Sequence, residues 1–182
     1  MQLRSIRPIG ADTLADLSGL LGTPPEGTCW CVAWEVADWQ GWSQRTAAQN
    51  RTLREALWQA GEYHGFVFYL DGAAIGWCRV GPASVWPKLV HERRIDEVSS
   101  HAFTCFGLAP AYCRQGHTHH FLDLVLAALR AAGVRRVRAA PKRLATDGPD
   151  GKAWNGPAGL FQRAGFVPVH ETAQYQRVAR TL

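Results

Sequence analysis

The chain has 182 residues, 47% of them hydrophobic and 19% charged, which is ordinary for one globular domain with a buried core. No apolar run is long enough to span a bilayer, and residues 1–7 lack the apolar region of a signal peptide, so we expect a cytoplasmic protein. The formal net charge of +5 suits several kinds of anionic partner, and an odd number of cysteines, five, argues against a disulfide framework.

The first 60 residues alternate strand and helix signals. Residues 3–9 predict a short strand, and Asp12 is placed to cap a helix with four leucines on one face. Gly22 ends that helix, and a second helix is predicted over residues 43–60.

A β-hairpin follows. Two apolar runs, 66–70 and 73–80, flank the pair Asp71-Gly72, which favours a tight two-residue turn between strands. Residues 83–100 are polar and contain Pro87, so we expect an irregular stretch there.

The second half predicts a strand, a helix and a strand in succession. Such a unit implies a parallel pair of strands joined by a right-handed crossover. A short helix with Pro157 in its first turn and two closing strands come last. The ranges are 102–108, 116–132 and 134–140 for the unit, and 166–169 and 174–178 for the closing strands.

The turn between the central strand and its helix can bind an anion. Pro110 ends the strand, and a basic turn containing Arg114 and Gly116 opens the helix. The first turn of a helix has unpaired N–H groups and the positive end of the dipole, which together suit a pyrophosphate. Gly116 would let the backbone approach the phosphates, and Arg114 adds a cation.

Residues 106–118 resemble the acyl-CoA signature of the GNAT acetyltransferase superfamily, in which a strand ending in an apolar residue–x–Pro leads into Gln/Arg-x-x-Gly-x-Gly/Ala. The order strand, helix, strand, loop, helix, Gly-Phe matches from about residue 102 to 166. Weaker matches to one subgroup are Cys29-Trp30-Cys31, Asn50-Arg51 and Gly76-Trp77-Cys78-Arg79-Val80. The resemblance covers nearly the whole chain.

This resemblance implies a single GNAT-like α/β domain over residues 1–182. Its mixed, twisted sheet would have six or seven strands, splayed near Gly107, with helices on both faces. The implied activity is transfer of an acetyl group from acetyl-CoA to an amine by direct attack. The family's habit suggests a homodimer, and neither a membrane nor a nucleic-acid partner is expected.

The resemblance also implies roles for individual residues. The Leu108 N–H would polarise the thioester carbonyl, and Asn155 would face the CoA arm. The whole implied cofactor-binding set is Phe106, Gly107, Leu108, Arg114, Gln115, Gly116, His117, Thr118, His119, Asn155 and Phe161.

Three positions depart from the family pattern. Cys113 replaces the first Gln/Arg, and Thr118 replaces the second Gly/Ala, although its hydroxyl could itself hold a phosphate. Phe161 stands where many relatives place a Tyr that protonates the departing thiol. Because Phe cannot donate a proton, another group or water would do so, or the thiolate would leave, which a thiol pKa of about 8.5 makes feasible.

The attacking amine must be neutral, so a base is required. His101, at the start of the central strand, and Glu35 are the two candidates, and neither rests on a motif. A plain strand-end histidine is the simpler interpretation of His101.

Other clusters have structural interpretations. His117, His119 and His120 look like a metal-binding tract, but side chains on a first helical turn do not all converge, so no metal site is expected. Cys29 and Cys31 are expected to pack in the interior. Two other functions remain open: a catalytically silent acyl-CoA-binding module, since no base is evident, and a nucleic-acid binder, suggested by charge but lacking a motif.

Overall fold

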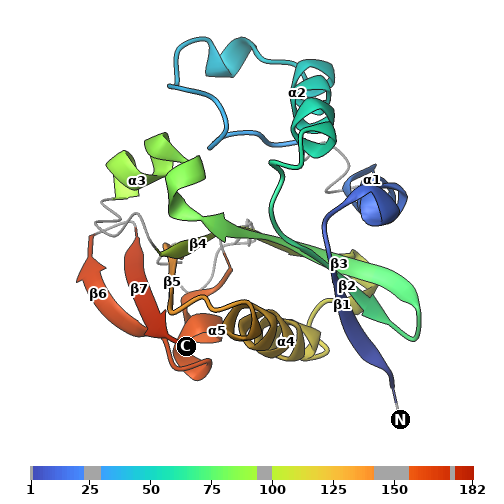
Figure 1. Cartoon of the computed structure of the whole chain (residues 1–182), viewed down its shortest axis with the longest axis vertical. Helices are drawn as coiled ribbons and strands as arrows, with labels where there is room; N and C mark the ends of the chain where they lie inside the picture. Colours follow the sequence, from blue (N-terminus) through green and yellow to red (C-terminus); the bar gives the residue numbers. More distant parts are fainter. Residues whose placement is uncertain (1, 23–29, 94–99, 142–155, 173–174) are drawn as a thin grey trace.

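The computed structural model describes residues 2–22, 30–93, 100–141, 156–172 and 175–182 (Figure 1). The strands are β1 (Arg4–Pro8), β2 (Phe66–Leu70), β3 (Ala73–Pro82), β4 (His101–Leu108), β5 (Arg136–Ala139), β6 (Val167–Glu171) and β7 (Gln176–Thr181). The helices are η1 (Ala11–Thr13), α1 (Leu14–Gly22), η2 (Trp42–Gln44), α2 (Ala47–Gln59), η3 (Ala83–Val85), α3 (Pro87–Arg93), η4 (Pro110–Tyr112), α4 (His117–Ala131) and α5 (Ala158–Arg163).

The strands form one seven-stranded mixed sheet in the order β1-β2-β3-β4-β5-β7-β6. Helices α1, α2 and α3 lie on one face, and α4 and α5 lie on the other (Figure 1). β4 and β5 are parallel and are joined through α4, while the other neighbouring strands are antiparallel. The predicted fold, an α/β domain with a mixed sheet covered on both faces, is confirmed.

Local capping explains where the predicted elements differ from the observed ones. The second helix begins at Ala47 rather than 43, because Thr46 and Gln49 form a reciprocal capping box at its start. Asp12 does not cap the first helix; it pairs with Arg7, and Gly10 precedes the opening turn.

The stretch 83–100, expected to be irregular, contains η3 and α3 within its described part. Pro87 is the first residue of α3, where its missing N–H costs nothing and its fixed φ suits a helix. The prediction was wrong because Pro87 was taken as a helix breaker.

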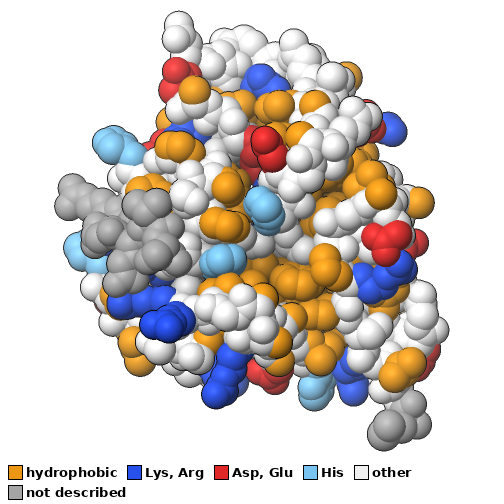
Figure 2. Space-filling view, viewed as in Figure 1, with side chains coloured by type: hydrophobic (Ala, Val, Ile, Leu, Met, Phe, Trp, Pro, Cys, Tyr) orange, Lys and Arg blue, Asp and Glu red, His pale blue; other side chains and the backbone are white. Residues whose placement is uncertain are grey.

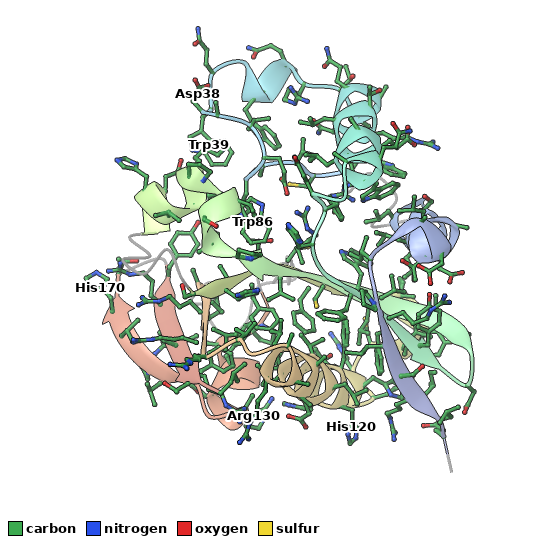
Figure 3. All side chains as sticks on the ribbon, in the orientation of Figure 1. Asp38, Trp39, Trp86, His120, Arg130 and His170 are labelled. Atoms are coloured by element: carbon green, nitrogen blue, oxygen red, sulfur yellow. The ribbon has the colours of Figure 1, made fainter. Side chains whose placement is uncertain are left out.

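The two faces of the sheet bury separate apolar cores. On the α4 side, Phe68 stacks on Phe121 with ring centroids 4.6 Å apart, and both side chains are fully buried. On the other face, leucines of α1 and rings such as Trp77 form a second core, and Trp34 and Trp86 belong to a third beside α3. The third core lies between α3 and the segment that carries Asp38 and Trp39 (Figure 3).

The sheet opens along the second half of β4. Arg79 lies opposite Cys105 whereas Val80 lies opposite Phe103, so Thr104 is the extra residue of a β-bulge. Pairing with β5 covers residues 101–103 of β4 and, among the described residues, goes no further. The sheet is therefore splayed beside Gly107, as expected.

Candidate functional site

The open edge of β4 presents backbone groups that a bound molecule could use. The Ala109 N–H donates to the Ile75 carbonyl across 2.8 Å, so Ala109 faces β3. Backbone groups alternate in direction along a strand, so the N–H and C=O of Leu108 and of Phe106 face the side where β5 pairing has ended. The predicted carbonyl-polarising N–H thus lies at an open edge.

Two glycines allow β3 and β4 to approach closely beside this edge. A Cβ on Gly107 would lie 2.5 Å from the Trp77 ring, and one on Gly76 would lie 2.5 Å from a Leu108 methyl. Contacts this short do not occur, so both positions require glycine where Leu108 is positioned.

The loop before α4 has the shape of an anion-binding nest. Arg114 and Gly116 both have left-handed backbones, with φ of +60° and +79°, and α4 begins immediately afterwards. Alternation of left- and right-handed residues turns successive N–H groups toward one concave side. Within the described chain, no acceptor is found for the N–H groups of residues 114–118, and Arg114, Gln115 and Gly116 are exposed.

The side chains of the histidines on α4 point in different directions. His117 is buried, with its ring 6.2 Å from that of Tyr112, so only its backbone faces the loop. His119 Nε2 accepts from Arg163 Nε of α5 at 3.1 Å. His120 points away from the sheet (Figure 3). Within the described ranges, no group of three or more His, Cys, Asp or Glu could hold a metal ion.

Phe161 is part of the aromatic core rather than a surface. Its ring has no exposed area and lies 5.8 Å from Phe103 and 5.1 Å from Phe166, centroid to centroid. The site residue Asn155 lies outside the described residues.

Of the two candidate bases, His101 has a free ring nitrogen. The structure gives its Nδ1 no partner, and burial followed by repulsion from His64 lowers the pKa of His101 below its usual 6.5. Its imidazole is therefore neutral at neutral pH and able to accept a proton.

Glu35 is engaged in a buried ion pair. Its Oε1 lies 2.7 Å from Arg79 Nη1, with both side chains at most 9% exposed, and also accepts from Trp86 Nε1. A carboxylate that neutralises a buried guanidinium is poorly placed to take up a proton. His101, for its part, lies at the opposite end of β4 from Leu108, so the structure brings neither candidate base to the Leu108 N–H.

Tyr63 was not predicted as a site residue, and Arg79 was named only as part of the match over residues 76–80. Arg79 is 3% exposed and its guanidinium carbon lies 3.4 Å from the centre of the Tyr63 ring. The sequence did carry one signal for this ion pair, a single arginine inside an otherwise apolar strand. A charge buried in this way requires a partner of opposite charge. Figure 2 shows apolar and histidine side chains gathered around a hollow near the middle of this face.

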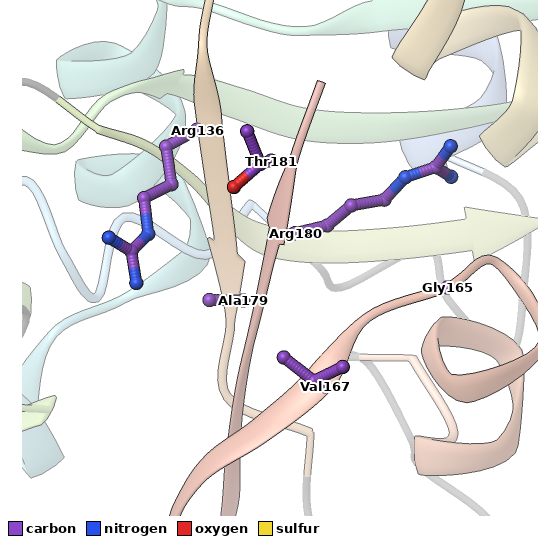
Figure 4. A pocket seen from close by; sticks show the side chains of 6 residues that line it. All are labelled: Arg136, Gly165, Val167, Ala179, Arg180 and Thr181. Atoms are coloured by element: carbon purple, nitrogen blue, oxygen red, sulfur yellow. The ribbon is translucent and has the colours of Figure 1, made fainter.

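A separate surface cavity of about 460 Å³ lies on β5, β7 and the start of β6. It contains none of the predicted site residues. Arg136 and Arg180 extend from it in opposite directions, so their guanidinium groups do not converge on one anion (Figure 4).

No protein-family model matches the sequence, and no curated protein matches it significantly. Solved structures share its fold. The aminoglycoside acetyltransferase AAC(6')-Ib in complex with coenzyme A has a TM-score of 0.63 at 16% identity, over 98% of this chain and 95% of its own. An N-acetyltransferase from Staphylococcus aureus gives 0.54 at 13%, covering 99% and 98%. A protein from Desulfovibrio desulfuricans assigned to the GNAT family gives 0.56 at 13%, with the same coverage.

Proposed function

We propose that this protein, which has the fold of the GNAT acetyltransferases, transfers an acetyl group from acetyl-CoA to the amine of a small acceptor. The observation that carries the proposal is the combination of an open β4 edge with an anion-binding loop at the start of α4. The two features follow one another along the chain, from Leu108 to the start of α4, so one molecule with a reactive end and a pyrophosphate could use both. No described helix is long and apolar enough to cross a membrane.

When bound, acetyl-CoA supplies the activated acyl group, and the protein supplies binding and orientation. In the proposal, N–H groups of residues 114–118 hold the pyrophosphate, with the Arg114 cation, the exposed Gln115 and the partly exposed Thr118 beside them. Phe106 and Leu108 use their outward backbone groups to hold the pantetheine arm, and the Leu108 N–H polarises the thioester carbonyl. His117 and His119 contribute backbone N–H groups rather than their rings.

His101 begins β4 and Leu108 ends it, so at about 3.3 Å per residue the two lie on the order of 20 Å apart, too far for His101 to touch an amine that attacks at Leu108. The attacking amine is therefore proposed to lose its proton to water at the open edge of β4. Phe161 donates no proton and lies in the core, so the departing thiol takes its proton from solvent or leaves as the thiolate.

The first test is calorimetric titration of acetyl-CoA into wild type and Gly116→Val. Saturable binding at micromolar concentration is expected for wild type, with at least a tenfold loss in Gly116→Val, because valine cannot adopt φ of +79° without moving the loop.

Gly133→Val is the matched control for this variant. Gly133 lies just after the other end of α4 with φ of +80°, and neither glycine has an atom within 4 Å of an added Cβ. The backbone strain is therefore equal, and Gly133→Val should bind acetyl-CoA normally. Equal affinity of all three proteins would contradict the phosphate assignment, and failure of wild type to bind would contradict the proposed function.

A further inference from the structure

The Glu35–Arg79 cluster leaves two buried hydrogen-bond donors without acceptors. Arg79 uses Nη1 for Glu35 and Nε for the His64 carbonyl, 2.9 Å away, but Nη2 has no partner in the structure. The Tyr63 hydroxyl is also buried without a partner. The guanidinium carbon lies 3.4 Å from the centre of the Tyr63 ring, so the two donors are close together.

A buried hydrogen-bond donor without an acceptor destabilises the folded protein. Two such donors side by side therefore indicate a place where a bound molecule could supply the acceptor. A buried N–H or O–H without a partner costs about 1–3 kcal/mol, and more when the group is charged. Burial raises the pKa of Tyr63, which keeps its hydroxyl protonated as a donor. An acceptor for both donors must offer oxygen lone pairs, and a carboxylate fits because its two oxygens can accept from both residues at once.

Both donor atoms are buried, and the neighbours nearest to solvent are Cys105, on β4 directly opposite Arg79, and His64, which are partly exposed. Cys105 lies two residues before Gly107 and precedes the open edge of β4. A molecule whose amine approaches that edge could therefore extend a second group toward Arg79.

Charges of both signs surround this cluster, with Glu62 near His64 and Glu92 and Asp38 near Lys88. Arg54 also lies over Tyr63, 5.0 Å from its ring centre, and Lys88 is buried nearby among tryptophans that include Trp34 of the same core. Among the described carboxylates, only Glu35 forms an ion pair in the cluster, and Arg79 already neutralises it. An aminoglycoside carries several ammonium groups and no carboxylate, so it has no charged acceptor to offer these two donors.

We propose that Arg79 Nη2 and the Tyr63 hydroxyl bind a carboxylate of the acceptor, which is therefore a small amino acid-like molecule and not a polycationic sugar. This inference rests on the proposed acetyl transfer for its kinetic test. It also has a binding test that needs no acetyl-CoA.

The kinetic test compares acceptors that differ only in their carboxylate. Phenylalanine, β-alanine and 4-aminobutyrate are each paired with the corresponding amide, with kanamycin as the polycationic comparison, and release of free CoA thiol is measured. At least one carboxylate should exceed its amide by tenfold or more in kcat/KM. The α-amine of an amino acid amide is less basic than that of the free amino acid, so more of it is neutral at a given pH. Amine reactivity alone would therefore favour the amide over the carboxylate.

Two variants test the residues themselves. Arg79→Gln combined with Glu35→Gln removes both buried charges together, which avoids leaving one charge unpaired, and it should abolish the preference for carboxylates. Tyr63→Phe removes an unpartnered hydroxyl, so it should raise the melting temperature while raising KM for carboxylates and leaving KM for amides unchanged. A merely structural role of Tyr63 would not separate the two substrate classes.

The binding test uses N-acetylphenylalanine and its amide as probes without acetyl-CoA. The carboxylate should raise the melting temperature of wild type but not of the double variant, and the amide should affect neither. Equal shifts with both probes, no shift with either, or an ordered water on both donors in a crystal with the probe would overturn the inference. If acetyl-CoA fails to bind but the carboxylate probe stabilises wild type, the proposed function fails and the carboxylate site stands.

Discussion

The ring of Phe161 is so closely surrounded that its position leaves little room for an added hydroxyl group. The ring has no exposed area, and an added Cβ on Gly156 would already lie 2.8 Å from it. Among the described residues, the rings that surround Phe161 are those of Phe103, Phe106 and Phe166, which offer a hydroxyl no acceptor.

Phe161→Tyr is therefore expected to lower the free energy of unfolding by about 1–3 kcal/mol, the cost of a buried unpaired hydroxyl, without raising turnover. Urea denaturation and an acetyl-transfer assay measure the two effects. Phe161→Leu is the control for ring packing, since it removes aromatic contacts without adding a polar atom. Faster turnover in the Tyr variant would place this ring at the departing thiol after all.

Two histidines should make the protein less stable in mild acid. Burial is the main cause that lowers the pKa of both His64 and His101 below 6.5, aided by Arg79 for His64 and by His64 for His101. Because the unfolded chain then binds more protons than the folded one as pH falls below 6.5, stability is present above that pH and is lost on acidification through the lowered values.

The expected result is a fall in the urea midpoint between pH 7.5 and pH 5.5 that is largely absent from the variant His64→Asn/His101→Asn. His120→Asn, an exposed change on α4, is the control and should keep the wild-type profile. An unchanged profile in the double variant would show that other groups cause the acid sensitivity.

At the level of single residues, the sequence predicted the loop residues that local backbone geometry requires. It did not predict the contacts between residues that are distant in the chain. Arg114 and Gly116 could be identified because a helix start has a local pattern, whereas Gly107 was expected only through the resemblance to the GNAT superfamily. The pairing of Glu35 with Arg79 joins residues 44 positions apart, so no local pattern reports it. Glu35 consequently looked like a base when its carboxylate is held in an ion pair.

At the scale of elements, α1 is held on the sheet by one polar link as well as by its leucines. The Tyr69 hydroxyl of β2 donates to Asp16 Oδ2 of α1 at 2.6 Å. Burial and this hydrogen bond raise the pKa of Tyr69 from 10 to about 12. The contribution of the bond to stability is thus present below pH 10 and lost as the pH rises toward 12.

Tyr69→Phe is expected to lower the free energy of unfolding by about 1–2 kcal/mol, because a hydrogen bond to a carboxylate is lost. A double-mutant cycle with Asp16→Asn, followed by urea denaturation at pH 7, isolates the pair. Strictly additive effects of the two changes would show that the link contributes nothing.

Most elements could be predicted because their signals are local. Asp71-Gly72 identified the hairpin, and the stripe through Phe121 and Leu129 identified α4. Helix α3 was missed because its burial comes from Trp34 and Ala102, which are distant in sequence. The order of the sheet beyond β5 likewise depends on long-range pairing with β7, which no short window contains.

For the whole molecule, the net charge of +5 should steer a polyanionic ligand toward the protein. Raising the salt concentration from about 0.1 to 1 M shortens the screening length from about 10 to 3 Å. The dissociation constant of acetyl-CoA measured by calorimetry should rise accordingly, while that of pantetheine, which lacks the phosphates, should not. Insensitivity of acetyl-CoA to salt would contradict an electrostatic contribution from the whole chain.

We expect the opening of the sheet to weaken the coupling between two parts of the molecule. Only three register pairs join β4 to β5 in the described structure, so strands β1–β4 and strands β5, β7 and β6 meet mainly through side-chain packing. Amide protons on the open side, those of Phe106 and Leu108, should exchange with solvent sooner than their neighbours that face β3. A ligand that forms hydrogen bonds along this edge would connect the two parts of the sheet. Part of its binding free energy would therefore appear as more cooperative unfolding of the whole molecule.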